Sequence, residues 1–111
     1  MSDVNAELAK IKKFDPWKAR KWREVSKISQ RTLAQRMGLS ARGYEYVCRC
    51  EAWTLGVTPG RLLVWAKTLR CKPSDLQSDA EELLFSRSEF DRWVAKGRPN
   101  VRDFVLGDPA Q

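Results

Sequence analysis

The fold is decided by residues 22–40, WREVSKISQRTLAQRMGLS. Ser29 is a good helix start, because a serine side chain can accept a hydrogen bond from a free backbone N–H group of the first turn. Three residues then share one helix face: Leu33, Ala34 and Met37. Gly38 stands where a left-handed residue ends a helix. The stretch therefore predicts a short helix followed by a sharp turn.

Helices are also predicted on both sides of this stretch. One begins at Asp15-Pro16 and runs to about Val25, since aspartate caps free N–H groups and proline fits the first helical position. Ser40 is interpreted as the cap of a third short helix, from Ala41 to about Cys50. The apolar face of that helix is expected to hold Tyr44, Val47 and Cys48.

The same signals recur in the second half of the chain. Thr58-Pro59 repeats the cap and the proline before a fourth helix, and residues 73–76, PSDL, predict a last short helical turn. The inward stripe of the fourth helix is Leu62, Leu63, Ala66 and Leu69. Residues 51–57 fit either a longer third helix or a loop. Residues 1–14 are expected to be a flexible arm and residues 107–111 a disordered tail.

Residues 79–106 form a C-terminal extension. Two overlapping capping boxes, at Ser86 and Ser88, predict a helix start before Phe90, and Gly97 with Pro99 ends that helix. Residues 101–106 fit a short strand or an apolar strap.

Composition narrows the function. A chain of 111 residues with 42% hydrophobic residues builds one compact domain, and its net charge of +7 indicates a polyanionic partner. Residues 14–50 hold nine basic and three acidic side chains, whereas residues 79–111 hold five basic and seven acidic ones. The chain has no histidine, which excludes Ser-His and Cys-His nucleophile pairs and histidine metal sites. We expect no enzymatic activity.

The three cysteines, Cys48, Cys50 and Cys71, are an odd number without the spacing of a zinc site. No apolar run is long enough for a signal peptide or a membrane span. We therefore expect a reduced, cytoplasmic protein that needs no cofactor, no metal and no membrane.

Residues 22–40 resemble the opening of the lambda-repressor-like (Cro/XRE-type) helix-turn-helix regulators. The resemblance is carried by Gln30, Leu33-Ala34, Gly38 and Ser40, and residues 62–76 are similar to the family's fourth helix and the turn after it. It implies an all-α, five-helix DNA-binding domain over residues 15–78, followed by a helical extension over residues 79–106. In the family a Glu usually closes the third helix at the position of Cys48. Here the nearest downstream acid is Glu51, which leaves an ion pair between Arg23 and Glu51 open.

The resemblance also implies which residues contact DNA. The base-reading positions fall on Ala41, Arg42, Glu45 and Tyr46. Arg42 is the strongest candidate, because its planar fork matches guanine O6 and N7; for Tyr46 a partly buried aromatic is the alternative. The DNA-backbone contacts fall on or near Lys27, Gln30, Arg31, Arg36, Ser40 and Arg49. Gly43 is unfavourable in a helix. At this position a glycine would allow close approach to the DNA backbone.

The tryptophans and the C-terminal extension are expected to pack against other parts of the chain or against a second copy. Trp17, Trp22 and Trp65 lie on apolar faces and are predicted in the core, while Trp53 fits core, interface or DNA contact. The extension is interpreted as a dimerisation element, with folding back onto the helical core as the alternative. Its candidate interface residues are Leu83, Leu84, Phe90, Trp93 and Val94.

These features predict a sequence-specific, DNA-binding transcription regulator, a repressor that binds a palindromic operator in double-stranded DNA as a homodimer. Its size and charge suit a plasmid or phage regulator in a prokaryotic host, acting at the nucleoid. The alternative is an antitoxin or another partner-binding protein on the same fold, with the extension neutralising a toxin. The sequence contains no motif typical of an RNA-binding module or of a nucleic-acid enzyme.

Overall fold

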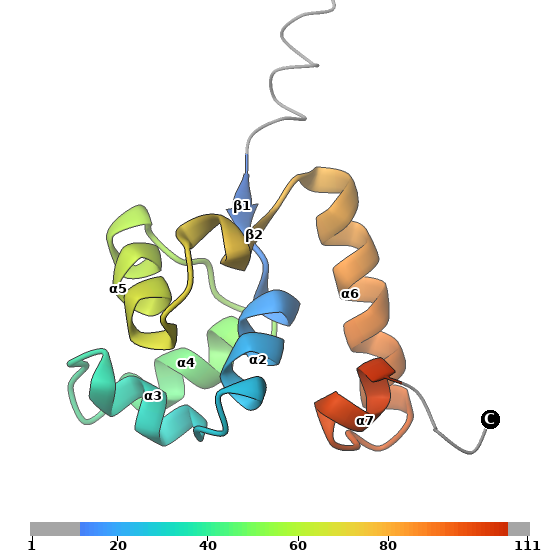
Figure 1. Ribbon diagram of the computed structural model, residues 1–111, viewed down its shortest axis with the longest axis horizontal. Coiled ribbons are helices and arrows are strands. Elements are labelled where there is room, and N and C mark those ends of the chain that lie inside the picture. Colours follow the sequence, from blue (N-terminus) through green and yellow to red (C-terminus); the bar gives the residue numbers. More distant parts are fainter. Residues whose placement is uncertain (1–11, 107–111) are drawn as a thin grey trace, which may run out of the picture.

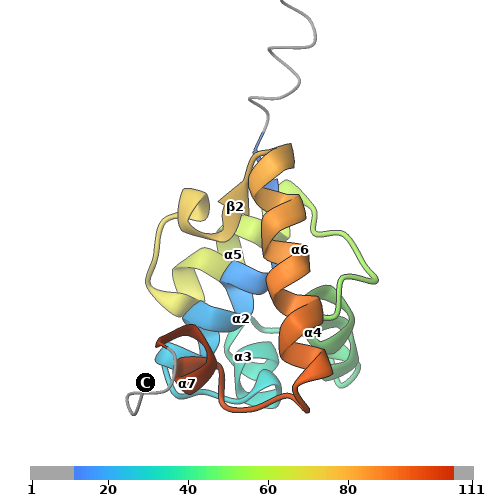
Figure 2. The same cartoon turned by 90° about the vertical axis from the view of Figure 1, so that its right-hand side faces the viewer.

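Helices make up most of the chain in the computed structural model, which describes residues 12–106 (Figure 1). The elements follow in the order β1 (Lys13–Phe14), α2 (Pro16–Val25), α3 (Gln30–Arg36), α4 (Gly43–Glu51), α5 (Pro59–Leu69), the 3-10 turn η1 (Pro73–Leu76), β2 (Gln77–Ser78), α6 (Ala80–Ala95) and α7 (Val101–Leu106). In Figure 1, α2 stands between a group formed by α3, α4 and α5 and a second group formed by α6 and α7. Figure 2 shows α6 running along the molecule in front of α2.

Three helices begin where the sequence predicts. The Asp15 carboxylate accepts from the Trp17 N–H at 2.9 Å, and the Ser29 hydroxyl accepts from the Thr32 N–H at 3.0 Å. The Thr58 hydroxyl accepts in the same way at the start of α5. Gly38, with φ of +75°, and Gly97, with φ of +86°, provide the left-handed turns expected after α3 and α6. These boundaries are confirmed because capping depends only on neighbouring residues.

The start of α4 differs from the prediction. The helix begins at Gly43, and its cap position is Arg42, which makes no side-chain capping hydrogen bond. Ser40 does not cap it; its carbonyl instead accepts from the Gly43 N–H at 2.8 Å and closes a turn. A Cβ on Gly43 would lie 2.3 Å from the Leu39 Cβ, so the glycine permits this turn to pack tightly. The close approach that the structure shows at Gly43 is to Leu39.

A first core fills the space between α2, α3, α4, α5 and η1. Its fully buried side chains include Leu33, Val47, Trp65 and Leu76. Residues 52–58 form a loop, which settles the question left open by the sequence: Trp53 takes a left-handed conformation just after α4, and Val57 packs on this core.

A second core joins α6 and α7 to α2. Trp17 and Trp93 are its centre, with their ring centroids 5.6 Å apart, and Phe90 and Val101 are buried beside them. Three partly buried side chains pack against it: Trp53, Val94 and Phe104. The extension therefore folds back onto α2, as in the alternative that the sequence left open: Phe90 and Trp93, expected at a dimer interface, are buried in their own chain, and Val94 is partly buried. Trp22, predicted in the core, is 36% exposed.

The α6 helix is also longer than predicted. Asp79 caps it by accepting from the Glu82 N–H at 2.9 Å, so neither Ser86 nor Ser88 is a helix start. Ser86 lies buried in the middle of α6 and donates to the Asp15 carboxylate at 2.6 Å. Residues 101–106 form the helix α7, where a strand or strap was expected.

The buried Asp15 carboxylate connects three elements. Besides capping α2 and accepting from Ser86 of α6, it accepts from the Ser78 hydroxyl of β2 at 2.7 Å. Strand β2 pairs in antiparallel fashion with β1, so Lys13 and Phe14 are ordered in a sheet, although the sequence places them in the flexible arm. The remainder of that arm, residues 1–11, and the predicted tail, residues 107–111, lie outside the described residues.

Candidate nucleic-acid interface

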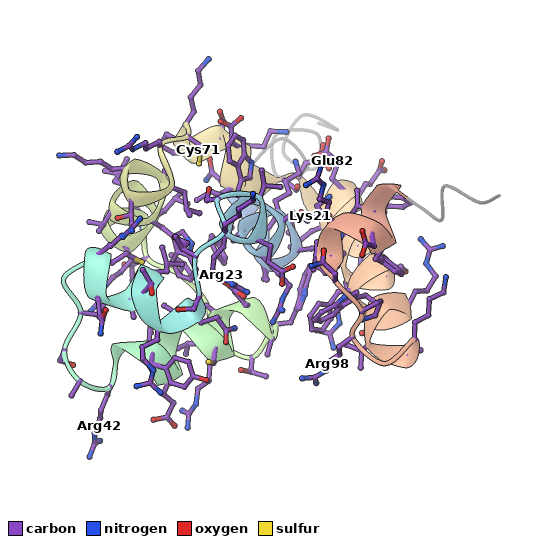
Figure 3. The ribbon with its side chains drawn as sticks, turned by 60° about the horizontal axis from the view of Figure 1, so that its bottom comes forward. Lys21, Arg23, Arg42, Cys71, Glu82 and Arg98 are labelled. Atoms are coloured by element: carbon purple, nitrogen blue, oxygen red, sulfur yellow. The ribbon has the colours of Figure 1, made fainter. Side chains whose placement is uncertain are left out.

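The turn between α3 and α4 forms an exposed, basic end of the molecule. Ala41 and Arg42 are both exposed at its tip. In Figure 3 the Arg42 guanidinium points away from every helix. This side chain is free to enter a groove of a ligand.

Two more exposed bases, Arg31 and Arg36, lie on α3 next to this turn, and the exposed Lys27 follows α2, where it lines a hollow with α7. Together with Arg42, none of them forms an ion pair with a carboxylate within residues 12–106. The Arg31 guanidinium stacks on the exposed ring of Tyr44, 4.5 Å from the ring centroid. The positive charge on this surface is therefore uncompensated and available to an anion.

Glu45 and Arg49 form an exposed ion pair with each other, one turn apart on α4. The pair occupies the outer face of the helix, in line with Arg42. Glu45 has thus a partner already, while Arg49 contributes less free positive charge than its neighbours.

Tyr46 does not belong to this exposed surface. It is half-buried, with its ring centroid 6.3 Å from that of Trp65, and burial raises its pKa to about 12. The inward face of α4 is Gly43, Tyr46, Val47 and Cys50. Tyr46 is thus the partly buried aromatic that the sequence left as the alternative, and Tyr44, expected on the apolar face, is the outer aromatic. Tyr46 is four residues before the buried Cys50 and shares its helix face, whereas Tyr44 is four residues before the half-buried Cys48.

Gln30 also turns inward, although the family resemblance implies a DNA-backbone contact. Its side-chain amide donates to the Glu51 carboxylate at 3.1 Å, and its oxygen accepts from the Cys48 thiol at 3.1 Å. Ser40, the other uncharged candidate, remains exposed in the turn.

A buried ion pair fixes α4 against α2. The fully buried Glu51 carboxylate accepts from Arg23 Nε at 2.7 Å and from Arg23 Nη2 at 3.0 Å. Arg23 also donates to the Ile28 carbonyl at 2.9 Å. In Figure 3 the Arg23 guanidinium lies between α2 and α4. Glu51, the last residue of α4, thus forms the ion pair that the sequence left open.

This network reaches the C-terminal helices. Arg20 lies 3.5 Å from Glu51, and its guanidinium covers the Trp93 ring at 4.5 Å from the centroid. Burial lowers the pKa of Arg20 from its ordinary value. The Glu24 carboxylate accepts from the Val101 N–H at 3.2 Å. The end of α4 and the extension are therefore held by the same face of α2.

A hollow of about 260 Å³ lies beside the exposed turn. Its walls come from α3 and the start of α4: Arg31, Ala34, Gln35, Leu39, Ser40, Ala41 and Tyr44. Most of these side chains are small or uncharged, and Arg31 stands at the rim.

The described residues form neither a metal-ligand cluster nor a membrane-spanning helix. Within residues 12–106, no group of three or more His, Cys, Asp or Glu side chains is placed to hold a metal ion. No helix in that part of the chain is both long and apolar enough to cross a bilayer. No family model, curated protein or solved structure matches the chain.

Proposed function

We propose that this chain is a sequence-specific, double-stranded-DNA-binding transcription regulator that acts as a repressor and binds a palindromic operator as a homodimer. The observation that supports it best is the uncompensated basic surface around the turn between α3 and α4, with Arg42 projecting from its tip. A polyanion neutralises such a surface, and a projecting arginine can read what lies in a groove.

The fold proposed with this function is the lambda-repressor-like one. The helices α2, α3, α4 and α5 with the turn η1 would be its five helical elements, α3 and α4 its helix-turn-helix pair. The left-handed Gly38 and the buried Arg23–Glu51 ion pair support this assignment. They fix the last residue of α4, Glu51, against α2, while Tyr44 and Glu45 of its first turn are exposed.

The contacts can be assigned by chemistry. Arg42 reads guanine through two of its guanidinium N–H donors, and Ala41 lies beside it for contact with a thymine methyl group. Lys27, Arg31 and Arg36 bind phosphates, which sets affinity and register without reading sequence. The stacking of Arg31 on Tyr44 holds that guanidinium beside the hollow.

The test is a selection of bound sequences from random duplex DNA at about 0.15 M salt. We expect a palindromic motif with half-sites about one helical turn apart. Arg42→Ala should weaken binding to that motif by roughly 1 to 3 kcal/mol and relax it at one position of each half-site. Arg102→Ala, an exposed arginine on α7, is the matched control and should leave both unchanged. If no motif is enriched and binding is indifferent to Arg42, the proposal is wrong.

Repression is tested separately in a bacterial reporter strain. The selected motif is placed across the promoter of the reporter, and the chain is expressed from a second plasmid. Expression should fall with the wild-type chain and with Arg102→Ala, but not with Arg42→Ala. A rise in expression would show an activator.

A further inference from the structure

The first half of α6 exposes large apolar side chains. Leu84 is 72% exposed and Phe85 is 62% exposed, while Leu83 between α6 and the loop is half-buried. The inward side of the same helix is occupied by Ser86, Phe90 and Trp93. Adjacent exposed apolar side chains of this size on a surface helix are typical of an interaction site.

The outer stripe of α6 is complementary to itself. At helical spacing it reads Ala80, Glu81, Leu84, Arg87, Ser88 and Asp91, all of them exposed. Glu81 lies three residues before Leu84, and Arg87 lies three residues after it. When two such helices pack antiparallel about Leu84, Glu81 of each meets Arg87 of the other, and Ala80 meets Ser88. In this pairing Leu84 of one copy faces Leu84 of the other, and no two side chains of like charge face each other next to it.

A hollow of about 380 Å³ continues the stripe toward the loop after α4. Its lining is almost wholly apolar and consists of Lys13, Trp53, Ala80, Leu83, Leu84 and Arg87. The Arg87 guanidinium stacks on the Trp53 ring at 5.4 Å from the centroid and lies 3.3 Å from Asp91. These contacts hold the positive charge at the rim of the hollow, while Glu81 has no ion-pair partner within residues 12–106.

We propose that α6 is the surface through which two copies of this chain associate, packed antiparallel about a two-fold axis near Leu84. Leu84 covers the edge of the apolar hollow of the other copy, and the Glu81–Arg87 pairs fix the register. Of the dimer residues expected from the sequence, this surface includes Leu83 and Leu84. It does not include Phe90, Trp93 and Val94. Its use on a palindromic operator rests on the proposed function, whereas the association itself does not.

The association is measured by sedimentation equilibrium of the full chain from about 1 to 200 µM. The wild type should reach twice the 12.8 kDa mass of one chain. Leu84→Glu should raise the dimer dissociation constant at least about a hundred-fold, because the symmetry places each substitution twice in the interface. Leu63→Glu, at a leucine of α5 that is 60% exposed, is the matched control and should leave the constant unchanged. Circular dichroism of each variant verifies that it is folded.

A charge swap tests the register. Glu81→Arg and Arg87→Glu should each weaken association about ten-fold, because like charges then face each other. The double variant Glu81→Arg/Arg87→Glu should return to within about three-fold of the wild type. A wild type that stays monomeric over the whole range, or a dimer that is indifferent to Leu84→Glu and to the swap, overturns the inference.

The DNA selection distinguishes this inference from the proposed function. A dimer sensitive to Leu84 that selects no DNA motif supports the interface and overturns the proposed function. A chain that selects a motif through Arg42 but remains monomeric on and off DNA supports the function and overturns the interface.

Discussion

Glu51 is the residue on which the position of α4 depends most. Its removal takes away the buried carboxylate that holds the Arg23 guanidinium, whose side chain is only 8% exposed, and leaves the partly exposed Glu24 carboxylate at 3.6 Å as its counter-charge. We expect Glu51→Ala to lower the free energy of unfolding by about 3 to 5 kcal/mol in urea denaturation. Glu45→Ala breaks an exposed ion pair of the same helix and should cost at most about 1 kcal/mol. Equal losses in the two variants would show that the buried pair does not hold α4.

Two half-buried or buried thiols make stability depend on alkaline pH. Burial raises the pKa of Cys50 and of Cys71 from an ordinary 9.0 to about 11. As pH rises, the unfolded chain releases these protons first, so the contribution is complete below pH 9 and is lost between about 9 and 11. Thermal unfolding from pH 8 to 11 should therefore show a falling midpoint. The double variant Cys50→Ala/Cys71→Ala should flatten this fall; an unchanged slope would contradict the assignment.

Single residues were predictable from sequence where their partners are neighbours. Asp15, Ser29 and Thr58 cap helices as expected, because a cap bonds within its own first turn. The partners of Glu51 could not be inferred in this way, since Arg23 and Gln30 lie 28 and 21 residues away along the chain. A resemblance pointed to an ion pair at this place, but only packing of α4 on α2 shows which acid forms it.

At the scale of elements, the α3–α4 turn has no room for one added methyl group at Gly43. Gly43→Ala would place a Cβ 2.3 Å from the Leu39 Cβ, so the turn or the helix must move. We expect a loss of about 1 to 3 kcal/mol in the free energy of unfolding, measured in urea. Gly60 in the first turn of α5 has no atom within 4 Å of such a Cβ, and Gly60→Ala should instead stabilise by up to about 1 kcal/mol. If Gly43→Ala is also stabilising, the tight contact is not required.

The prediction of α6 failed for a physical reason. Asp79, Ser86 and Ser88 each have the local sequence of a cap, and local sequence alone does not rank them. Packing does: Ser86 is buried against Asp15, and Phe90 and Trp93 are buried against Trp17, so the helix must already exist at Ser86. The sequence showed which residues of α6 are apolar, but not which of them face the core and which face outward. Sequence alone therefore did not show that Phe90 and Trp93 face the inside of their own chain.

At the scale of the molecule, positive charge and apolar surface lie on different elements. The unpaired bases Arg31, Arg36 and Arg42 are on α3 and the turn before α4, whereas Leu84 and Phe85 are on α6. The network from Glu51 through Arg20 to Trp93 joins the two sides through α2. A second copy on α6 would thus leave the basic surface of each chain open to DNA.

The charge distribution also predicts how DNA binding depends on salt. Each phosphate contact releases condensed counterions, so it adds about 0.9 to the slope of log affinity against log salt. Arg36→Ala should weaken binding to the selected motif and to unrelated duplexes by the same factor and reduce the slope by about 0.9 per chain. Arg42→Ala should affect chiefly the selected motif, and Arg102→Ala neither. Fluorescence anisotropy from about 0.05 to 0.3 M salt measures all three. A slope that changes equally in the Arg36 and Arg102 variants would mean that the whole net charge of +7, and not the α3–α4 surface, attracts the DNA.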